Sequence, residues 1–302
     1  MNRNINFSSK FKSANILSLF IFIMSVLFIL FKGLNYGIDF KGGTLIELRS
    51  DNTNINISEI RSSLNSMNLG DVNVKEFGKG GDFLIKVEQK TESNNQLIPE
   101  IKKTLINNLN AEINFRRVEN VGPKVSSELL QSGIIAISLS LIAMLFYIWI
   151  RFEWQFSVGS IVALFHDVII TIGIFSILSL EINLSIIAAV LTIVGYSMND
   201  TVVIYDRIRE NLNKYTKINI SETANLSINE TLSRTIITSL TTLLALLSIY
   251  ILGGEILRGF AFAMILGVLI GTYSSIFVAA PVLKFFKVSY KTLEKKEEKI
   301  VP

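Results

Sequence analysis

Long runs of apolar residues alternate with polar stretches along the chain. Six of these runs approach the roughly 20 apolar residues that a helix needs to cross a hydrocarbon core of about 30 Å. They lie at about 13–31, 129–150, 156–178, 184–204, 235–252 and 256–283. This pattern predicts a polytopic α-helical membrane protein with six transmembrane helices. The third and fourth runs each contain an acid, which a membrane-spanning helix rarely carries.

The stretch between the first two runs, 33–127, has a different pattern. Strand-like segments are found at 44–49, 71–77, 82–88 and 113–121, with a glycine-rich turn at 78–81. Apolar residues at helical spacing follow the first and the third of these segments: Ile57, Ile60, Leu64 and Met67, then Leu97, Ile101, Leu105 and Leu109. The order β-α-β-β-α-β predicts a small ferredoxin-like α+β domain. Such a fold names no function by itself.

Composition agrees with a membrane protein and narrows the chemistry. Half of the 302 residues are hydrophobic and 18% are charged, which lies outside the range of ordinary soluble chains. The chain has no cysteine and one histidine. Disulfides and thiolate metal sites are therefore excluded, and a histidine-rich metal centre is not expected.

Charge is distributed as in a membrane protein. The stretch 33–127 has 12 basic and 12 acidic residues, so the net charge of +4 resides in the membrane part and its edges and gives no reason to expect nucleic-acid binding. Basic residues gather in the N-terminal tail, at Arg151, between 205 and 234 and beyond 283, whereas the loops 179–183 and 253–255 have none. Because Lys and Arg stay on the cytoplasmic side, both termini are expected in the cytoplasm.

This orientation divides the chain into four parts. They are a cytoplasmic tail with the first helix at 1–32, an external α+β domain at 33–127, helices two to six at 128–284 with a cytoplasmic segment at 205–234, and a basic cytoplasmic tail at 285–302. The start of the chain is similar to a secretory signal. However, residues 32–37 offer no small-x-small cleavage site, which favours a retained anchor.

Five polar residues in the membrane part are candidate functional residues: His166, Asp167, Asn199, Asp200 and Arg234. An ionisable group at a helix centre costs about 2.5 kcal/mol or more. The fourth and fifth runs are consecutive and antiparallel, so Asp200 and Arg234 are expected at similar depth, where they can pair. A helix shift that makes or breaks this contact would bind and release a proton. The alternative is a structural ion pair that joins the two helices.

The other candidates also have two interpretations. His166 suits a proton relay, because the unperturbed pKa of histidine is near neutrality, or a hydrogen-bond donor in helix packing, and the sequence leaves both open. Asp167 beside it favours function slightly, because a carboxylate in the middle of a bilayer is costly. Arg234 alone is expected at a cytoplasmic helix end, so only pairing with Asp200 suggests a role.

Several stretches together match one family in order and spacing. They are GIDFKGGTLIEL at 37–48, VGPKVSSELLQSG at 121–133, LFHDVIITIGIFSIL at 164–178, GYSMNDTVVIYDRIREN at 195–211 and NETLSRTIITSLTTLLAL at 229–246. With them the chain resembles the SecF family of protein translocase subunits from residue 37 to about 284. Met198 stands where an aliphatic residue is expected. Beyond GIDFKGGT the external domain has no matching stretch, so contacts to substrate polypeptides are not assigned.

The resemblance implies half of an RND-superfamily membrane unit in a bacterial inner membrane, with SecD supplying the other six helices. It implies association with the SecYEG channel and, in many bacteria, with YajC and YidC. It also implies that the proton-motive force, rather than ATP, helps to complete the translocation of polypeptides. No cofactor and no enzymatic activity are expected.

The resemblance also assigns residues. The family's functional acid and arginine in helices four and five fall on Asp200 and Arg234, with Asn199 beside the acid, and its His-Asp pair falls on His166 and Asp167. The residues of its sequence motifs that we interpret as structural are Gly37, Asp39, Gly42, Gly43, Gly122 and Pro123.

Two other functions compete with this interpretation. The alternative function is an RND-type, proton-coupled exporter of small molecules or lipids. Such exporters usually carry both membrane halves and two much larger external domains in one chain, so the length of this chain argues against it. An intramembrane aspartyl protease needs two carboxylates that share a proton. The rise per residue places Asp167 and Asp200 about 8 Å apart in depth, and neither lies in a Tyr-Asp or Gly-x-Gly-Asp setting.

Overall fold

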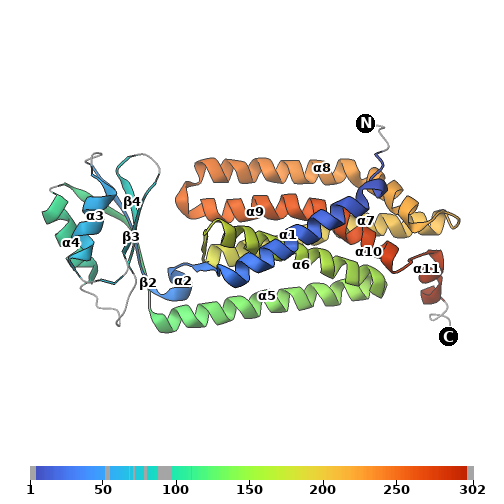
Figure 1. Cartoon of the computed structure of the whole chain (residues 1–302), viewed down its shortest axis with the longest axis horizontal. Coiled ribbons are helices and arrows are strands. Elements are labelled where there is room, and N and C mark those ends of the chain that lie inside the picture. Colours follow the sequence, from blue (N-terminus) through green and yellow to red (C-terminus); the bar gives the residue numbers. More distant parts are fainter. Residues whose placement is uncertain are drawn as a thin grey trace. The chain divides into compact units, whose positions relative to one another are not determined.

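The computed structural model describes residues 5–51, 55–67, 69–70, 72–77, 80–87, 97–109 and 111–297. The chain forms two compact units, which we describe separately. The helical unit comprises 1–35, 136–180 and 185–302, and the α+β unit comprises 36–135 and 181–184. Figure 1 shows the elements of both units along the chain.

Six helices of the described chain are long and apolar enough to cross a membrane, as predicted. They are α1 (Phe11–Phe31), α5 (Pro123–Arg151), α6 (Trp154–Ile177), α7 (Leu184–Lys214), α8 (Ile220–Leu252) and the succession α9 (Gly254–Ser274), η2 (Ser275–Ala279) and α10 (Ala280–Phe285). The segment η2 is a π-helix. Two short helices, η1 (Ser8–Lys10) and α11 (Tyr290–Glu297), complete the described helical unit.

Helices α7 and α8 extend well beyond the apolar runs that predicted them. They continue through most of the segment 205–234, and only residues 215–219 separate them. Polar contacts hold these extensions together: Arg207 Nε donates to Glu230 Oε2 at 2.7 Å, and Asn211 Nδ2 donates to Ser227 Oγ at 3.0 Å. Hydropathy identifies only the part of a helix that crosses hydrocarbon, so it missed ends that polar side chains stabilise.

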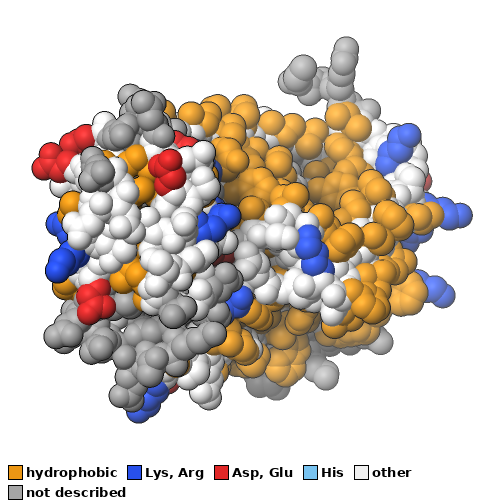
Figure 2. Space-filling view, turned by 60° about the vertical axis from the view of Figure 1, so that its left-hand side comes forward, with side chains coloured by type: hydrophobic (Ala, Val, Ile, Leu, Met, Phe, Trp, Pro, Cys, Tyr) orange, Lys and Arg blue, Asp and Glu red, His pale blue; other side chains and the backbone are white. Residues whose placement is uncertain are grey.

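The centre of the helical unit is formed by α6, α7 and α9, which are far more buried than α1, α5 and α8. Glycines allow close approach, since a Cβ at Gly267 of α9 would collide with Ile193 of α7, and one at Gly173 of α6 with Ser25 of α1. Figure 2 shows hydrophobic side chains over much of the visible surface of this unit. The described helices therefore form a bundle with an apolar exterior and three central helices.

The α+β unit contains a four-stranded antiparallel sheet. Its strands are β2 (Gly43–Ser50), β3 (Val72–Glu76), β4 (Asp82–Val87) and β5 (Ile113–Val121), in the order β3-β4-β2-β5. Helices α3 (Ile57–Asn65) and α4 (Leu97–Leu109) lie on one face of the sheet (Figure 1). This order and connectivity confirm the predicted ferredoxin-like fold. Residues 78 and 79 of the predicted turn lie outside the described residues.

The sheet and its two helices enclose one apolar core. Alternate strand residues such as Ile46, Leu48, Phe83 and Ile85 pack against the helical residues Ile60, Leu64, Ile101 and Leu105. Two short segments belong to the same unit, namely α2 (Ile38–Lys41) and strand β6 (Glu181–Ile182), which pairs with β1 (Asn35–Tyr36). The GIDFKGG motif therefore contacts residues 181–184 within this unit.

An acid is buried at one end of the sheet. Asp82 is 5% exposed, and its two carboxylate oxygens accept hydrogen bonds from Arg49 Nε and Nη2, each at 2.6 Å. Arg116 lies 3.7 Å away. The hydrogen bond from Arg49 holds the pKa of Asp82 below its usual value, against the opposing effect of burial.

Candidate functional site

Helix α6 places Asp167 at the centre of the bundle, where its side chain is fully buried. The carboxylate contacts a neighbour on its own helix and two other helices. Its Oδ1 lies 2.9 Å from His166 Nδ1, and its Oδ2 accepts hydrogen bonds from Ser274 Oγ of α9 at 2.7 Å and from Ser197 Oγ of α7. Hydroxyl and imidazole donors therefore compensate the burial of this acid, with no permanently charged partner.

His166 links this acid to α1. Its ring stacks against Tyr273 of α9 with centroids 6.4 Å apart. The Tyr273 hydroxyl donates to the carbonyl oxygen of Ala14 at 2.9 Å and accepts from Ser18 Oγ at 3.0 Å, both on α1. The second ring nitrogen, His166 Nε2, is buried without a hydrogen-bond partner. The ring therefore lies between the Asp167 carboxylate and the Tyr273 ring, with one polar atom left unbonded in the bundle interior.

Asp200 lies about one turn beyond Ser197 on α7 and is 3% exposed. Its Oδ2 is 3.5 Å from Thr272 Oγ1 of α9, and Thr272 Oγ1 is 2.7 Å from Ser239 Oγ of α8. Thr235, one turn before Ser239, has a buried hydroxyl without a partner. Asp200 is therefore hydrogen-bonded to one hydroxyl of α9, which is hydrogen-bonded in turn to a hydroxyl of α8.

The sequence predicted that Asp200 and Arg234 can pair, and in the structure Arg234 lies near enough to interact electrostatically with Asp200 without direct contact. No ion pair joins these two described residues, and both Arg234 and Asn199 are exposed. One reason is the face of α8: its buried residues include Thr231, Thr235 and Ser239, four apart, and Arg234 lies off this stripe.

The register between the two helices is the other reason. Tyr196 contacts Thr242 and Arg207 contacts Glu230, so the α8 residues level with Asp200 are near 237 and 238. Arg234 is about one turn away from that level. Counting residues along the apolar runs placed the two at similar depth, and it does not resolve an offset of about one turn.

The motif glycines lie where the backbone requires them. Gly42 and Gly43 have φ angles of 80° and 133°, which favour glycine. A Cβ at Gly43 would lie 2.6 Å from the carbonyl oxygen of Val87, and one at Gly42 would lie 3.3 Å from that of Val121. The two glycines thus let β2 enter the sheet between its neighbours.

The other motif residues lie at or near the first residues of α7 and α5. Asp39 Oδ2 accepts a hydrogen bond from the backbone nitrogen of Leu184, the first residue of α7, at 2.9 Å. Gly37 donates its N–H to the carbonyl oxygen of Ile182 at 2.9 Å. Gly122 precedes Pro123, the first residue of α5, a position where proline fits because its missing N–H is not needed.

Sequence reasoning missed the hydroxyls that surround the acids, namely Ser197, Ser239, Thr272 and Ser274. Serine and threonine are ordinary residues of membrane helices, so their type carries little information. The one available signal was spacing, because Ser197 precedes Asp200 by three residues and shares its helix face. Contacts from α9 depend on tertiary packing, which no local pattern shows.

Comparisons with known proteins identify the family. Residues 27–53 match the SecD/SecF GG motif, and residues 101–289 match the family described as protein export membrane protein SecD/SecF, C-terminal. A protein translocase subunit SecF from Rickettsia bellii is 48% identical over 270 residues, 89% of each chain. One from Rickettsia typhi is 44% identical over 296 residues, 97% of this chain and 96% of that one. The chain belongs to the SecD/SecF family.

Solved structures of the SecD/SecF family share this fold. The crystal structure of SecDF from Thermus thermophilus, described as a translocon-associated membrane protein, is 36% identical with a TM-score of 0.85 and matches 95% of this chain. SecDF in a super-membrane-facing form is 32% identical with a TM-score of 0.67 over 99% of this chain. This chain spans only 39% and 40% of those two chains.

Proposed function

We propose that this chain is the SecF-type subunit of a Sec protein-export complex and uses the proton-motive force to help complete ATP-independent stages of polypeptide translocation. The observation that carries the proposal is the pair of acids inside the helical unit. Asp167 and Asp200 are buried in spans that are apolar enough to cross a membrane, and their hydrogen-bond partners are hydroxyls and one imidazole. Buried acids of this kind mark proton pathways.

The chemistry of the proposed pathway is reversible protonation. Asp200, Asp167 and His166 carry the proton, and hydroxyl groups orient them. Each proton that crosses the membrane releases about 2.3 kcal/mol per 100 mV. A few protons therefore supply enough free energy for a conformational change that acts on a translocating polypeptide.

A SecD-type partner would complete the pathway. Asn199 and Arg234 are exposed on α7 and α8, and exposed polar side chains at these places are costly in lipid. A second membrane subunit that covers them removes this cost and brings its own groups toward Asp200. Arg234 then serves as a charge that a helix movement brings to the acid or withdraws from it.

The wider assembly is proposed from family membership. It includes SecD, the SecYEG channel and possible accessory partners of the YajC and YidC type. We place the protein in a bacterial inner membrane with both termini in the cytoplasm, because the basic residues gather at those ends. The α+β unit then faces the periplasm and the emerging chain.

Replacement of Asp200 tests the proposal. Membrane vesicles containing the complex are energised to a fixed proton-motive force, and completion of translocation of a preprotein is measured after its ATP-dependent start. Asp200→Asn should abolish the stimulation by the proton-motive force. Asp206→Asn, which changes an exposed acid on the same helix, should retain it. Undiminished stimulation in Asp200→Asn, with the complex assembled, would sink the proposal.

A further inference from the structure

One turn of α9 contacts both buried acids. Thr272 reaches Asp200 of α7, and Ser274 reaches Asp167 of α6 at 2.7 Å. Residues two apart on a helix point in different directions, so the two hydroxyls serve acids on different neighbours of α9. The side chain of Ser274 is fully buried and can find hydrogen-bond partners only inside the bundle.

Close packing of α9 on α7 makes these contacts possible. A Cβ at Gly271 would lie 3.0 Å from the Cβ of Ser197, and one at Gly267 would overlap Ile193. The glycines therefore allow the turn 272–274 to approach α7 to a distance that a larger residue would prevent. Ser197 also donates to Asp167, so α7 and α9 hold the same carboxylate oxygen from two sides.

A π-helix follows directly after this turn, at Ser275–Ala279. Single π turns inserted in α-helices are rare and occur often at functional sites. The far end of the π segment is fixed: Tyr205 of α7 is fully buried and donates its hydroxyl to the carbonyl oxygen of Ala279 at 2.9 Å.

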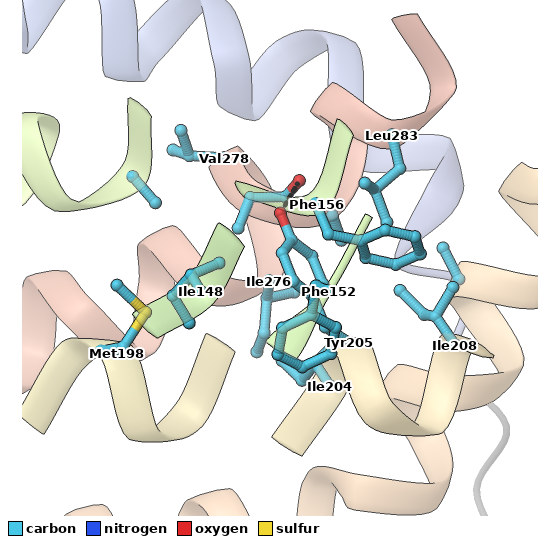
Figure 3. Packing of buried hydrophobic residues seen from close by; sticks show 14 of the residues in the cluster. Ile148, Phe152, Phe156, Met198, Ile204, Tyr205, Ile208, Ile276, Val278 and Leu283 are labelled. Carbon is cyan, nitrogen blue, oxygen red and sulfur yellow. Dashed lines mark hydrogen bonds between the residues drawn. The ribbon is translucent and has the colours of Figure 1, made fainter. Parts of the chain in front are cut away.

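A glycine and two aromatic rings surround this hydroxyl bond. A Cβ at Gly159 of α6 would collide with the Tyr205 hydroxyl. Figure 3 shows the Tyr205 ring packed beside Phe152 and Phe156, among buried aliphatic residues. The Ala279 end of the π segment is therefore anchored, whereas its other end adjoins the turn of α9 whose hydroxyls hold the acids.

We infer that Thr272 and Ser274 are positioning residues that hold the two buried acids from one turn of α9, and that Tyr205 fixes the helix beyond it. The role in proton transfer rests on the proposed function, but the positioning of the carboxylates does not. The titratable groups around the acids are His166 on α6, Tyr273 on α9 and, further away, Arg234 on α8. Helix α1 contributes the hydroxyl of Ser18 on this side.

A matched pair of serine variants tests the inference. Ser274→Ala removes a hydroxyl bound to Asp167, whereas Ser275→Ala removes an equally buried hydroxyl whose acceptor is the carbonyl oxygen of Thr272 in its own helix. The full-length complex is labelled with dicyclohexylcarbodiimide, which reacts with protonated carboxyl groups, and labelling of Asp167 is measured by mass spectrometry across pH. We expect several-fold faster labelling in Ser274→Ala, because a donor to the ionised form is lost, and no change in Ser275→Ala.

Thr272 is tested in the same way at Asp200. Thr272→Val, which keeps the shape and removes the hydroxyl, should change the pH profile of Asp200 labelling, and Thr272→Ser should restore it. Tyr205→Phe should change the labelling of both acids, because it releases the far end of the π segment. Identical profiles in Ser274→Ala, Thr272→Val and the unmodified chain would overturn the inference.

The two claims can fail separately. Labelling reports where the carboxylates lie, and it needs no translocation. Suppose that labelling changes in the α9 variants while Asp200→Asn still responds to the proton-motive force. That result would support the positioning role and reject the proposed function. If labelling is unchanged in the α9 variants but Asp200→Asn loses the stimulation, the positioning role is rejected and the proposed function is supported.

Discussion

The α+β unit and the helical unit each bury a carboxylate, and they stabilise it differently. Asp82 accepts two hydrogen bonds of 2.6 Å from the Arg49 guanidinium. Asp167 contacts two serine hydroxyls and the ring of His166. A guanidinium stays charged and keeps its acid ionised, whereas hydroxyls can donate or accept and tolerate either protonation state. We therefore interpret Asp82 as a structural acid, and we keep Asp167 as a carrier in the proposed proton pathway.

The largest effect is expected at Asp167. Asp167→Asn keeps an oxygen that accepts hydrogen bonds from Ser197 and Ser274 but removes the proton-carrying group. Stimulation of translocation by the proton-motive force should fall at least about tenfold, with little change in the thermal unfolding of the purified complex. If the complex with Asp167→Asn translocates normally, or fails only because the helical unit unfolds, Asp167 does not differ from Asp82 as a proton-carrying acid.

The opposite result is expected at Asp82. Asp82→Asn removes a charged partner of Arg49 and should destabilise the α+β unit by about 1–2 kcal/mol, while the proton-motive stimulation stays. Hydrogen exchange of β2 and β4 in the full-length chain measures the loss. Glu59→Gln, an exposed acid of the same unit, is the control. A transport defect without local destabilisation in Asp82→Asn would contradict the structural role.

The same ion pair should respond to pH. The pKa of Asp82 is lowered in the folded state by Arg49, so its contribution is complete above the unfolded value of about 3.9 and is lost as pH falls through the folded pKa. Protection of β4 against hydrogen exchange should therefore weaken below about pH 4 in the unmodified chain. Asp82→Asn should not show this loss of protection at low pH. The same loss in that variant would contradict the role of Asp82.

A smaller effect is expected at Asp39, an acid that is only partly buried. Asp39→Ala removes the hydrogen bond to the backbone nitrogen of Leu184, and loss of such a cap costs about 1 kcal/mol. Hydrogen exchange in the first turn of α7 should become faster. Asp39→Asn keeps the side-chain oxygen and should behave nearly like the unmodified chain. Equal exchange in Asp39→Ala would show that the cap is not needed.

Much of the fold was readable in the sequence because its causes are local. Apolar length identified six helices, and alternation in 33–127 identified the ferredoxin-like sheet with its two helices. The ends of α7 and α8 were missed because polar contacts such as Asn211 with Ser227 extend them. Hydropathy contains no term for such contacts.

The candidate site was only partly readable. The adjacent residues His166 and Asp167 contact each other as their sequence suggests, but Asp200 and Arg234 do not pair. Pairing depends on helix rotation and register, and an offset of about one turn is enough to separate two side chains. Ser274 and Thr272 come from a helix far along the chain, and only the folded bundle brings them to the acids.

Proton flux through the complex is the quantity that decides whether Asp200 carries protons. The complex, purified with its SecD-type partner and reconstituted into vesicles with a pH-sensitive dye inside, receives a fixed pH difference and a translocating preprotein. We expect a translocation-dependent proton flux in the unmodified complex and in Asp206→Asn, and no such flux in Asp200→Asn. An equal flux in Asp200→Asn and in the unmodified complex would contradict this expectation.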